Sequence, residues 1–270
     1  MDYWFSEMHT PNIKLGFRIK REIAHATSKF QDIHLFETCD YGKLLVIDGT
    51  VQTTTRDEFI YHEMIVHPPM FTHSKPQKIL IIGGGDGGAA REVLNHEPRE
   101  VHVVEIDEKV VEICKRYLPE ISSSYNDPRV HLHIENGKEF IRREGNFDVI
   151  IVDSTDPVGP AADLFREDFY EDMKKALKKD GVISQQCGTP FYHPEEFSQV
   201  KKELEKVFEY VKIYIAYIPT YPSGMWAFVM ASDMPIERRR KLNFATKYYN
   251  DEIYYSSMSL PNFVKKYCED

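Results

Sequence analysis

The sequence feature that most constrains the fold is an apolar run that is followed directly by glycines. Residues 79–82 read Ile-Leu-Ile-Ile, and residues 83–88 read Gly-Gly-Gly-Asp-Gly-Gly. An apolar run without polar alternation is typical of a strand buried on both faces, and glycines let a backbone approach a ligand closely. Apolar residues at helical spacing follow between Ala89 and Leu94. The pattern predicts a strand, a glycine-rich loop and a helix, which together open a nucleotide-binding α/β unit.

The residues around this loop narrow the kind of ligand. A tight turn that packs a helix onto a sheet would need the same glycines, so the loop alone does not decide. Residues 101–104 predict a second strand, which delivers Glu105 and Asp107 about 20 residues after the loop, where a ribose-binding carboxylate is expected. Asp86 lies among the glycines, and a carboxylate there would repel a pyrophosphate. We therefore expect a nucleoside that carries a positive group.

Composition limits the partners. A net charge of -9 argues against nucleic acid or an anionic membrane and suits a cationic small molecule. The four cysteines are far apart and form no C-x-x-C pair, so we expect neither a disulfide framework nor a bound metal. His131 and His133 have a spacing that can chelate a metal, but solvent-facing histidines explain it more simply. Without a signal peptide or a spanning run, the chain is expected to be cytoplasmic and to have no membrane partner.

Residues 1–60 are predicted to form a small antiparallel β domain, and residues 61–270 a larger catalytic domain. Residues 33–38 and 44–47 flank a turn sequence at 40–43, which predicts a hairpin. A helical pattern begins at Asp57, and Pro68-Pro69 is expected to end it. On spacing alone, Tyr61 and His62 are most simply residues of this helix's surface.

The rest of the chain alternates strands with helices. The final two strands, at 211–217 and 226–231, have no helix between them. A mostly parallel sheet with an antiparallel final pair is the arrangement of a methyltransferase-type Rossmann sheet, so the fold class is α/β. Strands are predicted at 130–134, 149–152 and 181–186, and helices at 108–118 and 166–179. Ligands of such sheets bind at the carboxyl ends of the strands, where Asp86, Glu105, Asn136 and Asp153 are all expected.

Several sequence blocks, taken together and in order, resemble the spermidine synthases, aminopropyltransferases that use decarboxylated S-adenosylmethionine. One block alone is moderately specific, whereas the whole series covers nearly the entire chain. The blocks are Trp4-Phe5 with Glu7, Phe30-Gln31, residues 45–49, residues 52–64, residues 83–88, residues 153–160 and residues 218–224.

The resemblance implies roles for individual residues. Asp153 matches the family's proton acceptor, Asp156 matches an acid that holds the diamine, and Ser154 and Thr155 lie between them. Asp86 would hold the aminopropyl amine of the donor. On the donor side the resemblance further implies Gln31, Gln52 and Gly83, Glu105 for the ribose hydroxyls, and Asn136, Gly137 and Pro160 around the adenine. In the acceptor channel it implies Tyr61, His62, Gln186, Tyr221 and Trp226.

The implied reaction moves the aminopropyl group to putrescine and gives spermidine and methylthioadenosine. Decarboxylated S-adenosylmethionine would be a co-substrate, with no permanently bound cofactor. The implied assembly is a homodimer or homotetramer, built through the N-terminal β domain.

Two positions depart from the family pattern. The family usually has Asp-Gly where this chain has Asn136-Gly137. An amide oxygen still accepts a hydrogen bond from an exocyclic amino group, so we expect weaker nucleoside binding rather than none. Many relatives carry an acid where this chain has Gly188, which leaves agmatine, cadaverine or a longer polyamine open as the acceptor.

Two other functions compete with aminopropyl transfer. A methyltransferase would share the sheet and the nucleoside site, but the carboxylates at 86, 153 and 156 disfavour it. A non-catalytic polyamine-binding protein is the alternative from another class. Binding a polyamine does not require a second carboxylate beside Asp153, whereas deprotonation of the amine makes use of both Asp153 and Asp156.

Overall fold

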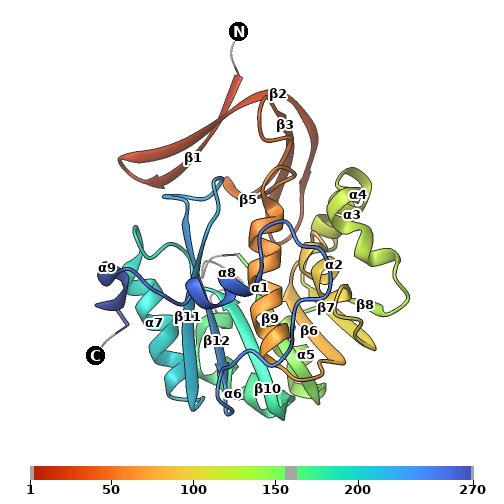
Figure 1. Ribbon diagram of the computed structural model, residues 1–270. Coiled ribbons are helices and arrows are strands. Elements are labelled where there is room, and N and C mark those ends of the chain that lie inside the picture. Colours follow the sequence, from red (N-terminus) through yellow and green to blue (C-terminus); the bar gives the residue numbers. More distant parts are fainter. Residues whose placement is uncertain (1–2, 156–162, 269–270) are drawn as a thin grey trace.

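The computed structural model describes residues 3–155 and 163–268, so the predicted site residues Asp156 and Pro160 lie outside the described part. The chain forms two sheets, with the smaller one above the end of the larger one in Figure 1. The smaller sheet has five antiparallel strands in sequential order. They are β1 Tyr3–Thr10, β2 Ile13–Thr27, β3 Asp32–Thr38, β4 Lys43–Ile47 and β5 Thr50–Thr54. The predicted hairpin at residues 33–47 is confirmed.

The larger sheet has seven strands in the order β11-β12-β10-β9-β6-β7-β8. Its strands are β6 Lys78–Gly83, β7 Glu100–Glu105, β8 Val130–Ile134, β9 Phe147–Asp153, β10 Leu177–Gln186, β11 Tyr210–Tyr217 and β12 Met225–Ser232. Pairing is parallel from β10 across to β8, and β12 runs antiparallel to both β10 and β11. This order confirms the predicted methyltransferase-type Rossmann sheet.

Helices cover both faces of this sheet (Figure 1). Ile79 and Ile81 of β6 belong to a core with α1 and α2, whereas Leu80 and Ile82 belong to a core with α5, α6 and α7. The unalternated apolar run thus fills two cores at once, as predicted for a strand buried on both faces. The helices are α1 Glu58–Thr72, α2 Gly88–Leu94, α3 Glu108–Tyr117, α4 Pro119–Ser122, α5 Gly137–Arg143, α6 Glu167–Ala176, α7 Pro194–Glu205, α8 Asp251–Ser256 and α9 Asn262–Lys265.

Three sequence-based expectations are wrong. Helix α1 continues through Pro68-Pro69 to Thr72, because tight packing around its fully buried final turns outweighs the cost of two prolines in the helix, about 3 kcal/mol or more each. Tyr61 and His62 are 8% and 3% exposed and not on the surface, since α1 is buried on nearly every side. Helix α6 ends at Ala176, so residues 177–180 extend β10 rather than the helix.

The described residues contain no helix that is long and apolar enough to cross a membrane. None of the four cysteines, all of which lie in the described part of the chain, forms a disulfide bond.

Candidate active site

The predicted convergence of polar residues at the carboxyl ends of the strands is confirmed. Gly83 of β6 lies opposite Asp153 of β9, Glu105 is the last residue of β7, and Asn136 directly precedes α5 after β8. Ligand atoms of His62, Asp86 and Asp153 lie within 4.8 Å of one another. The glycine loop, the end of β9 and helix α1 therefore bring two carboxylates and an imidazole to one point.

The glycine loop is shaped around these side chains. Gly83 and Gly84 have φ values of +82° and +67°, and the Gly84 amide donates to the Asp153 carbonyl at 2.8 Å. A Cβ on Gly83 would lie 2.1 Å from that carbonyl oxygen, and one on Gly88 would lie 2.2 Å from Cε1 of His62. The glycines thus give Asp153 and His62 the space that they occupy.

Asp153 is a carboxylate with an unusually high proton affinity. The Tyr61 hydroxyl donates to its Oδ1 at 2.7 Å. Burial raises the pKa of Asp153 to about 6, and neighbouring Asp86 adds to the rise, although His62 and the Tyr61 hydrogen bond oppose it. A carboxylate with this pKa is ionised at neutral pH and is a better proton acceptor than an ordinary aspartate.

His62 lies between two carboxylates, an arrangement that the sequence-based interpretation missed. Its Nδ1 is 2.6 Å from Glu58 Oε2, its Nε2 is 3.2 Å from Asp86 Oδ2, and Arg91 donates to Glu58 at 2.8 Å. Burial alone would lower the pKa of His62, but Asp86 and Glu58 raise it well above its usual value. Both ring nitrogens of His62 thus face carboxylates as hydrogen-bond donors.

Asp86 is therefore already paired. Burial opposes its ionisation, but the His62 cation and the Gly88 amide, which donates to Oδ1 at 2.8 Å, lower the pKa of Asp86. Glu58 and His62 are four residues apart on one helix, and this spacing is the sequence signal that points to the Glu58–His62 ion pair.

Glu105 and Asp107 have separate tasks. Asp107 caps α3 by accepting from the Lys109 amide at 3.0 Å, and it accepts from Ser28 Oγ at 2.6 Å. Glu105 is buried against Gly85, where an added Cβ would lie 2.8 Å from Oε2. Burial raises the pKa of Glu105 to about 7, although the Asp107 amide donates to Oε1 at 2.9 Å. Glu105 is thus the carboxylate that remains for a ligand.

Aromatic rings line the approach to Asp153. The Tyr221 ring lies 5.8 Å from that of Tyr61 and 4.5 Å from that of Trp226, measured between centroids. The Tyr221 hydroxyl donates to the Gln52 carbonyl at 2.6 Å, and Asp57 accepts from the Thr220 amide at 2.9 Å. Asp57, which sequence reasoning missed, thereby fixes the loop that carries Tyr221.

A hydrogen bond joins the end of β10 to the residues that follow β9. Gln186 Nε2 donates to the Ser154 carbonyl at 3.3 Å, and Gln186 Oε1 accepts from the Gly188 amide at 2.8 Å. Ser154 Oγ donates to the Thr155 carbonyl at 3.1 Å. Gly188 has a φ of +72°, a conformation that favours glycine at this position.

On the other side of the glycine loop, Asn136 has a structural task that the sequence did not reveal. Its Oδ1 accepts from the amides of Lys138 at 2.8 Å and Glu139 at 3.2 Å, as the N-cap of α5. The amide oxygen that we expected to face a nucleoside is therefore occupied. Gly137 lies against Ile82, where an added Cβ would be 2.5 Å from Cγ2.

The remaining donor-side candidates lie on the smaller sheet and the loop before β3. The backbone amide of Gln31 donates to Ser28 Oγ at 3.1 Å. Ser28 Oγ in turn donates to Asp107, so this loop reaches the residues that follow β7. Gln52 Nε2 donates to the Thr50 carbonyl at 3.1 Å.

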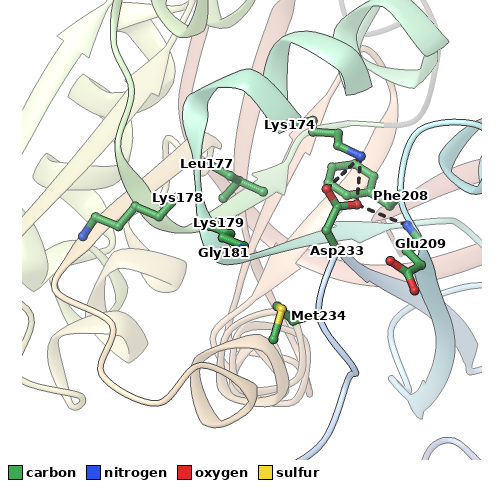
Figure 2. A pocket seen from close by; sticks show the side chains of 9 residues that line it. All are labelled: Lys174, Leu177, Lys178, Lys179, Gly181, Phe208, Glu209, Asp233 and Met234. Carbon is green, nitrogen blue, oxygen red and sulfur yellow. Dashed lines mark hydrogen bonds and ion pairs between the residues drawn. The ribbon is translucent and has the colours of Figure 1, made fainter.

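A surface pocket of about 480 Å³ lies elsewhere in the fold (Figure 2). It is lined by residues at the start of β10 and the end of β12, which is the edge opposite the carboxyl ends of the parallel strands. Lys174 and Asp233 form an ion pair of 2.8 Å at its rim. We do not assign the chemistry to this pocket, because Asp86, Glu105 and Asp153 lie at the other edge of the sheet.

Comparison with known proteins gives consistent matches. Residues 58–241 match the model of the spermine/spermidine synthase domain, and residues 3–55 match that of the spermidine synthase tetramerisation domain. A polyamine aminopropyltransferase of Caldicellulosiruptor saccharolyticus is 44% identical over 275 residues, covering 100% of this chain and 99% of the relative. One of Thermoplasma acidophilum is 45% identical over 268 residues, covering 98% of each.

Solved structures agree. A crystal structure of a spermidine synthase in complex with the transition-state analogue AdoDATO has a TM-score of 0.95 and 42% identity, covering 98% of this chain and 94% of that one. The spermidine synthase of Thermotoga maritima gives a TM-score of 0.92 and 41% identity, covering 98% and 93%. The family models, the sequence identities and the site geometry agree: the chain belongs to the spermine/spermidine synthase family of polyamine aminopropyltransferases.

Proposed function

We propose that the protein transfers the aminopropyl group of decarboxylated S-adenosylmethionine to putrescine, which gives spermidine and methylthioadenosine. The observation that carries the proposal is the buried Asp153 carboxylate, whose pKa is raised to about 6 and whose Oδ1 accepts from the Tyr61 hydroxyl at 2.7 Å. The relatives named polyamine aminopropyltransferase and the spermidine synthase bound to AdoDATO support it.

The reaction needs a neutral amine. An alkylamine has a pKa near that of lysine, ~10.4, so its neutral form costs about 4.6 kcal/mol at pH 7. Asp153 orients the amine and takes its proton as the nitrogen attacks. The new N–C bond forms while the C–S bond breaks, and its electron pair converts the sulfonium into the neutral thioether of methylthioadenosine. Alignment of nitrogen, carbon and sulfur supplies further acceleration.

We infer two sides of one site. On the donor side, Glu105 accepts from the ribose hydroxyls, Asp86 holds the aminopropyl amine, and Gln31, Gln52, Gly83, Asn136, Gly137 and Pro160 complete the pocket. On the acceptor side, Asp153 to Asp156, with Tyr61, His62, Gln186, Tyr221 and Trp226, hold the diamine. The incoming ammonium would share Asp86 with His62, which lies 3.2 Å from Oδ2, and with the Gly88 amide, which donates to Oδ1.

We also propose a cytoplasmic homo-oligomer, dimeric or tetrameric, assembled through an N-terminal domain of residues 1–60, with catalysis in residues 61–270. The match of residues 3–55 to a tetramerisation domain supports this assembly. Apolar side chains that a partner could cover lie on β1 and β2, where Trp4 is 55% and Met8 61% exposed.

A product assay tests the proposal. The purified protein is given decarboxylated S-adenosylmethionine with putrescine, cadaverine, agmatine or spermidine, and methylthioadenosine and each polyamine product are measured by mass spectrometry. We expect putrescine to be preferred. Preference for agmatine or a longer amine would keep the chemistry and change the acceptor. No methylthioadenosine with any amine would refute aminopropyl transfer and favour a binding protein, while methylated product from S-adenosylmethionine would favour a methyltransferase.

The pH dependence should report Asp153. The carboxylate accepts a proton only when ionised, so kcat/KM is expected to fall as the pH drops through about 6. In Tyr61→Phe the carboxylate loses a hydrogen bond that favours its charged form, so its pKa rises and the acid limb moves to higher pH. The exposed Tyr255 serves as control, and Tyr255→Phe should keep the wild-type profile. Identical acid limbs in Tyr61→Phe and wild type would contradict this assignment.

The N-cap at Asn136 predicts a gain of affinity. In Asn136→Asp one carboxylate oxygen keeps the cap of α5, and the other can accept from the exocyclic amino group of adenine. A net hydrogen bond of about 0.5–1.5 kcal/mol corresponds to about two- to tenfold tighter methylthioadenosine binding in calorimetry. Asn250 caps α8 in the same way, so Asn250→Asp is the matched control and should change nothing. Unchanged or weaker binding by Asn136→Asp would place Asn136 away from the adenine.

A further inference from the structure

An irregularity in strand pairing gathers side chains that regular alternation would separate. In the β2–β3 pair, Glu22 lies opposite Phe36 and Ala24 opposite Leu35, so β2 carries one extra residue between them. Residues 22 and 25 of a regular strand would point to opposite faces. The bulge puts Glu22 on the same face as His25 and as His34, which lies directly opposite His25.

Asp32, at the start of β3, orients both imidazoles. Its Oδ1 is 2.8 Å from His25 Nε2, and its Oδ2 is 2.9 Å from His34 Nε2. Because an ionised carboxylate only accepts hydrogen bonds, each Nε2 carries its hydrogen toward Asp32. The two rings stack with centroids 4.1 Å apart, and His34 Nδ1 lies 2.7 Å from Glu22 Oε1. His34 thus directs Nδ1 to Glu22, and in His25 Nδ1 is the ring nitrogen that does not bond to Asp32.

We propose that Glu22, His25 and His34 form a site for one divalent transition-metal ion, with Zn²⁺ as the best-fitting ion. One ligand atom from each residue lies within 4.8 Å of the others. Two imidazole nitrogens and a carboxylate oxygen, with water in the fourth position, are a known zinc ligand set. A carboxylate that fixes the second ring nitrogen, the part that Asp32 takes, is the usual support of a metal-binding histidine.

The two rings are nearly parallel, with an interplanar angle of 6°, so one imidazole must turn to direct its nitrogen at the ion that the other binds. The His25 side chain is 47% exposed and has room to turn. Ligand atoms around tetrahedral zinc stand about 3.4 Å apart, given Zn–N and Zn–O distances of about 2.0–2.2 Å. The ion replaces the hydrogen shared by His34 Nδ1 and Glu22, and that proton leaves to solvent. The Glu22 side chain is 44% exposed, so it can move outward until its oxygen is about 3.4 Å from His34 Nδ1 instead of 2.7 Å. Two carboxylates beside two imidazoles also favour a cation electrostatically.

The bound ion would join β2 to β3 beside the bulge. It lies on the smaller sheet and uses none of the residues assigned to aminopropyl transfer, so this proposal does not depend on the proposed function.

Calorimetric titration of the metal-stripped full chain with Zn²⁺ tests the proposal. Wild type is expected to bind one ion per chain, and His25→Ala and His34→Ala at least about tenfold more weakly. Zn²⁺ should also raise the midpoint of thermal unfolding of wild type but not of these variants. The matched control is His193→Ala. His193 is 41% exposed and lies 3.4 Å from Glu196, but among the described residues it belongs to no group of three possible metal ligands. This variant should bind like wild type.

Two further variants keep the test decisive. Glu22→Gln preserves size and removes the charged ligand, so weaker Zn²⁺ binding by this folded variant supports the site. Cys39→Ser removes the exposed thiol, and retained binding excludes a thiolate as the ligand. Wild-type affinity in His25→Ala, His34→Ala and Glu22→Gln alike, or loss of binding in Cys39→Ser, would overturn the proposal.

Discussion

Asp153→Asn is expected to lose about 10²–10⁴-fold in turnover while it still binds the nucleoside. Asparagine has nearly the same shape, and its oxygen can still accept from the Tyr61 hydroxyl. It cannot accept a proton, so the amine would have to lose its proton to water. The protein is saturated with decarboxylated S-adenosylmethionine and putrescine, and methylthioadenosine release is measured, while methylthioadenosine affinity is followed by calorimetry.

The control for this variant is Asp168→Asn. Asp168 is an exposed residue of α6 that pairs with Lys138 at 2.6 Å, so its substitution should leave both turnover and binding unchanged. Turnover near the wild-type level in Asp153→Asn would remove Asp153 from the role of base. Loss of nucleoside binding along with turnover would make it a structural residue instead.

The largest effect on stability is expected at Gly83. Alanine there would adopt a left-handed backbone at φ +82°, which costs about 1–2 kcal/mol, and its Cβ would meet the Asp153 carbonyl at 2.1 Å. Overpacking of this kind adds about 1–3 kcal/mol, so we expect Gly83→Ala to lower the free energy of unfolding by about 2–5 kcal/mol. Relief of the collision would also displace Asp153, so turnover of the folded variant should fall. Urea denaturation and methylthioadenosine release measure the two effects.

Gly49 separates the two causes. Its φ of +77° is almost the same, but a Cβ there would meet nothing within 4 Å. Gly49→Ala should therefore lose only the backbone cost, about 1–2 kcal/mol, and should keep its turnover. Equal losses of stability in both variants would show that the backbone conformation, and not the contact with Asp153, makes the Gly83 position sensitive.

Local patterns were sufficient to predict most of the larger sheet. The run at 79–82 is apolar without alternation, so its own residues identify it as a strand, although Ile79 pairs with Val101 and with Val149 much later in the chain. In the smaller sheet, the individual strands β1 and β2 were not predicted. Strand β2 contains two shifts of register in its pairing with β3, and each shift breaks the alternation that identifies a strand. The continuation of α1 through Pro68-Pro69 depends on burial, which no local pattern contains.

The site divides in the same way. The rule that ligands bind at strand ends places Glu105 and Asp153 from the sequence alone. It does not show that His62 lies between Glu58 and Asp86, because that contact joins α1 to the glycine loop across the fold. The N-cap role of Asn136 was within reach, since asparagine before a helix commonly caps it. The contact of Asp57 with Thr220 joins residues 163 positions apart and had no local signal.

The bonds from Tyr221 to Gln52 and from Thr220 to Asp57 also set an order of events during synthesis on the ribosome. A nascent chain that has just completed β9 already contains Asp153, Glu105 and the glycine loop, yet it lacks the aromatic wall contributed by Tyr221 and Trp226. The parts that we propose to bind the nucleoside are thus made first, and the aromatic residues that we propose to face the acceptor are made last. We therefore expect turnover only from chains whose β11–β12 hairpin has been translated and has joined the sheet, and none from a fragment that ends before this hairpin.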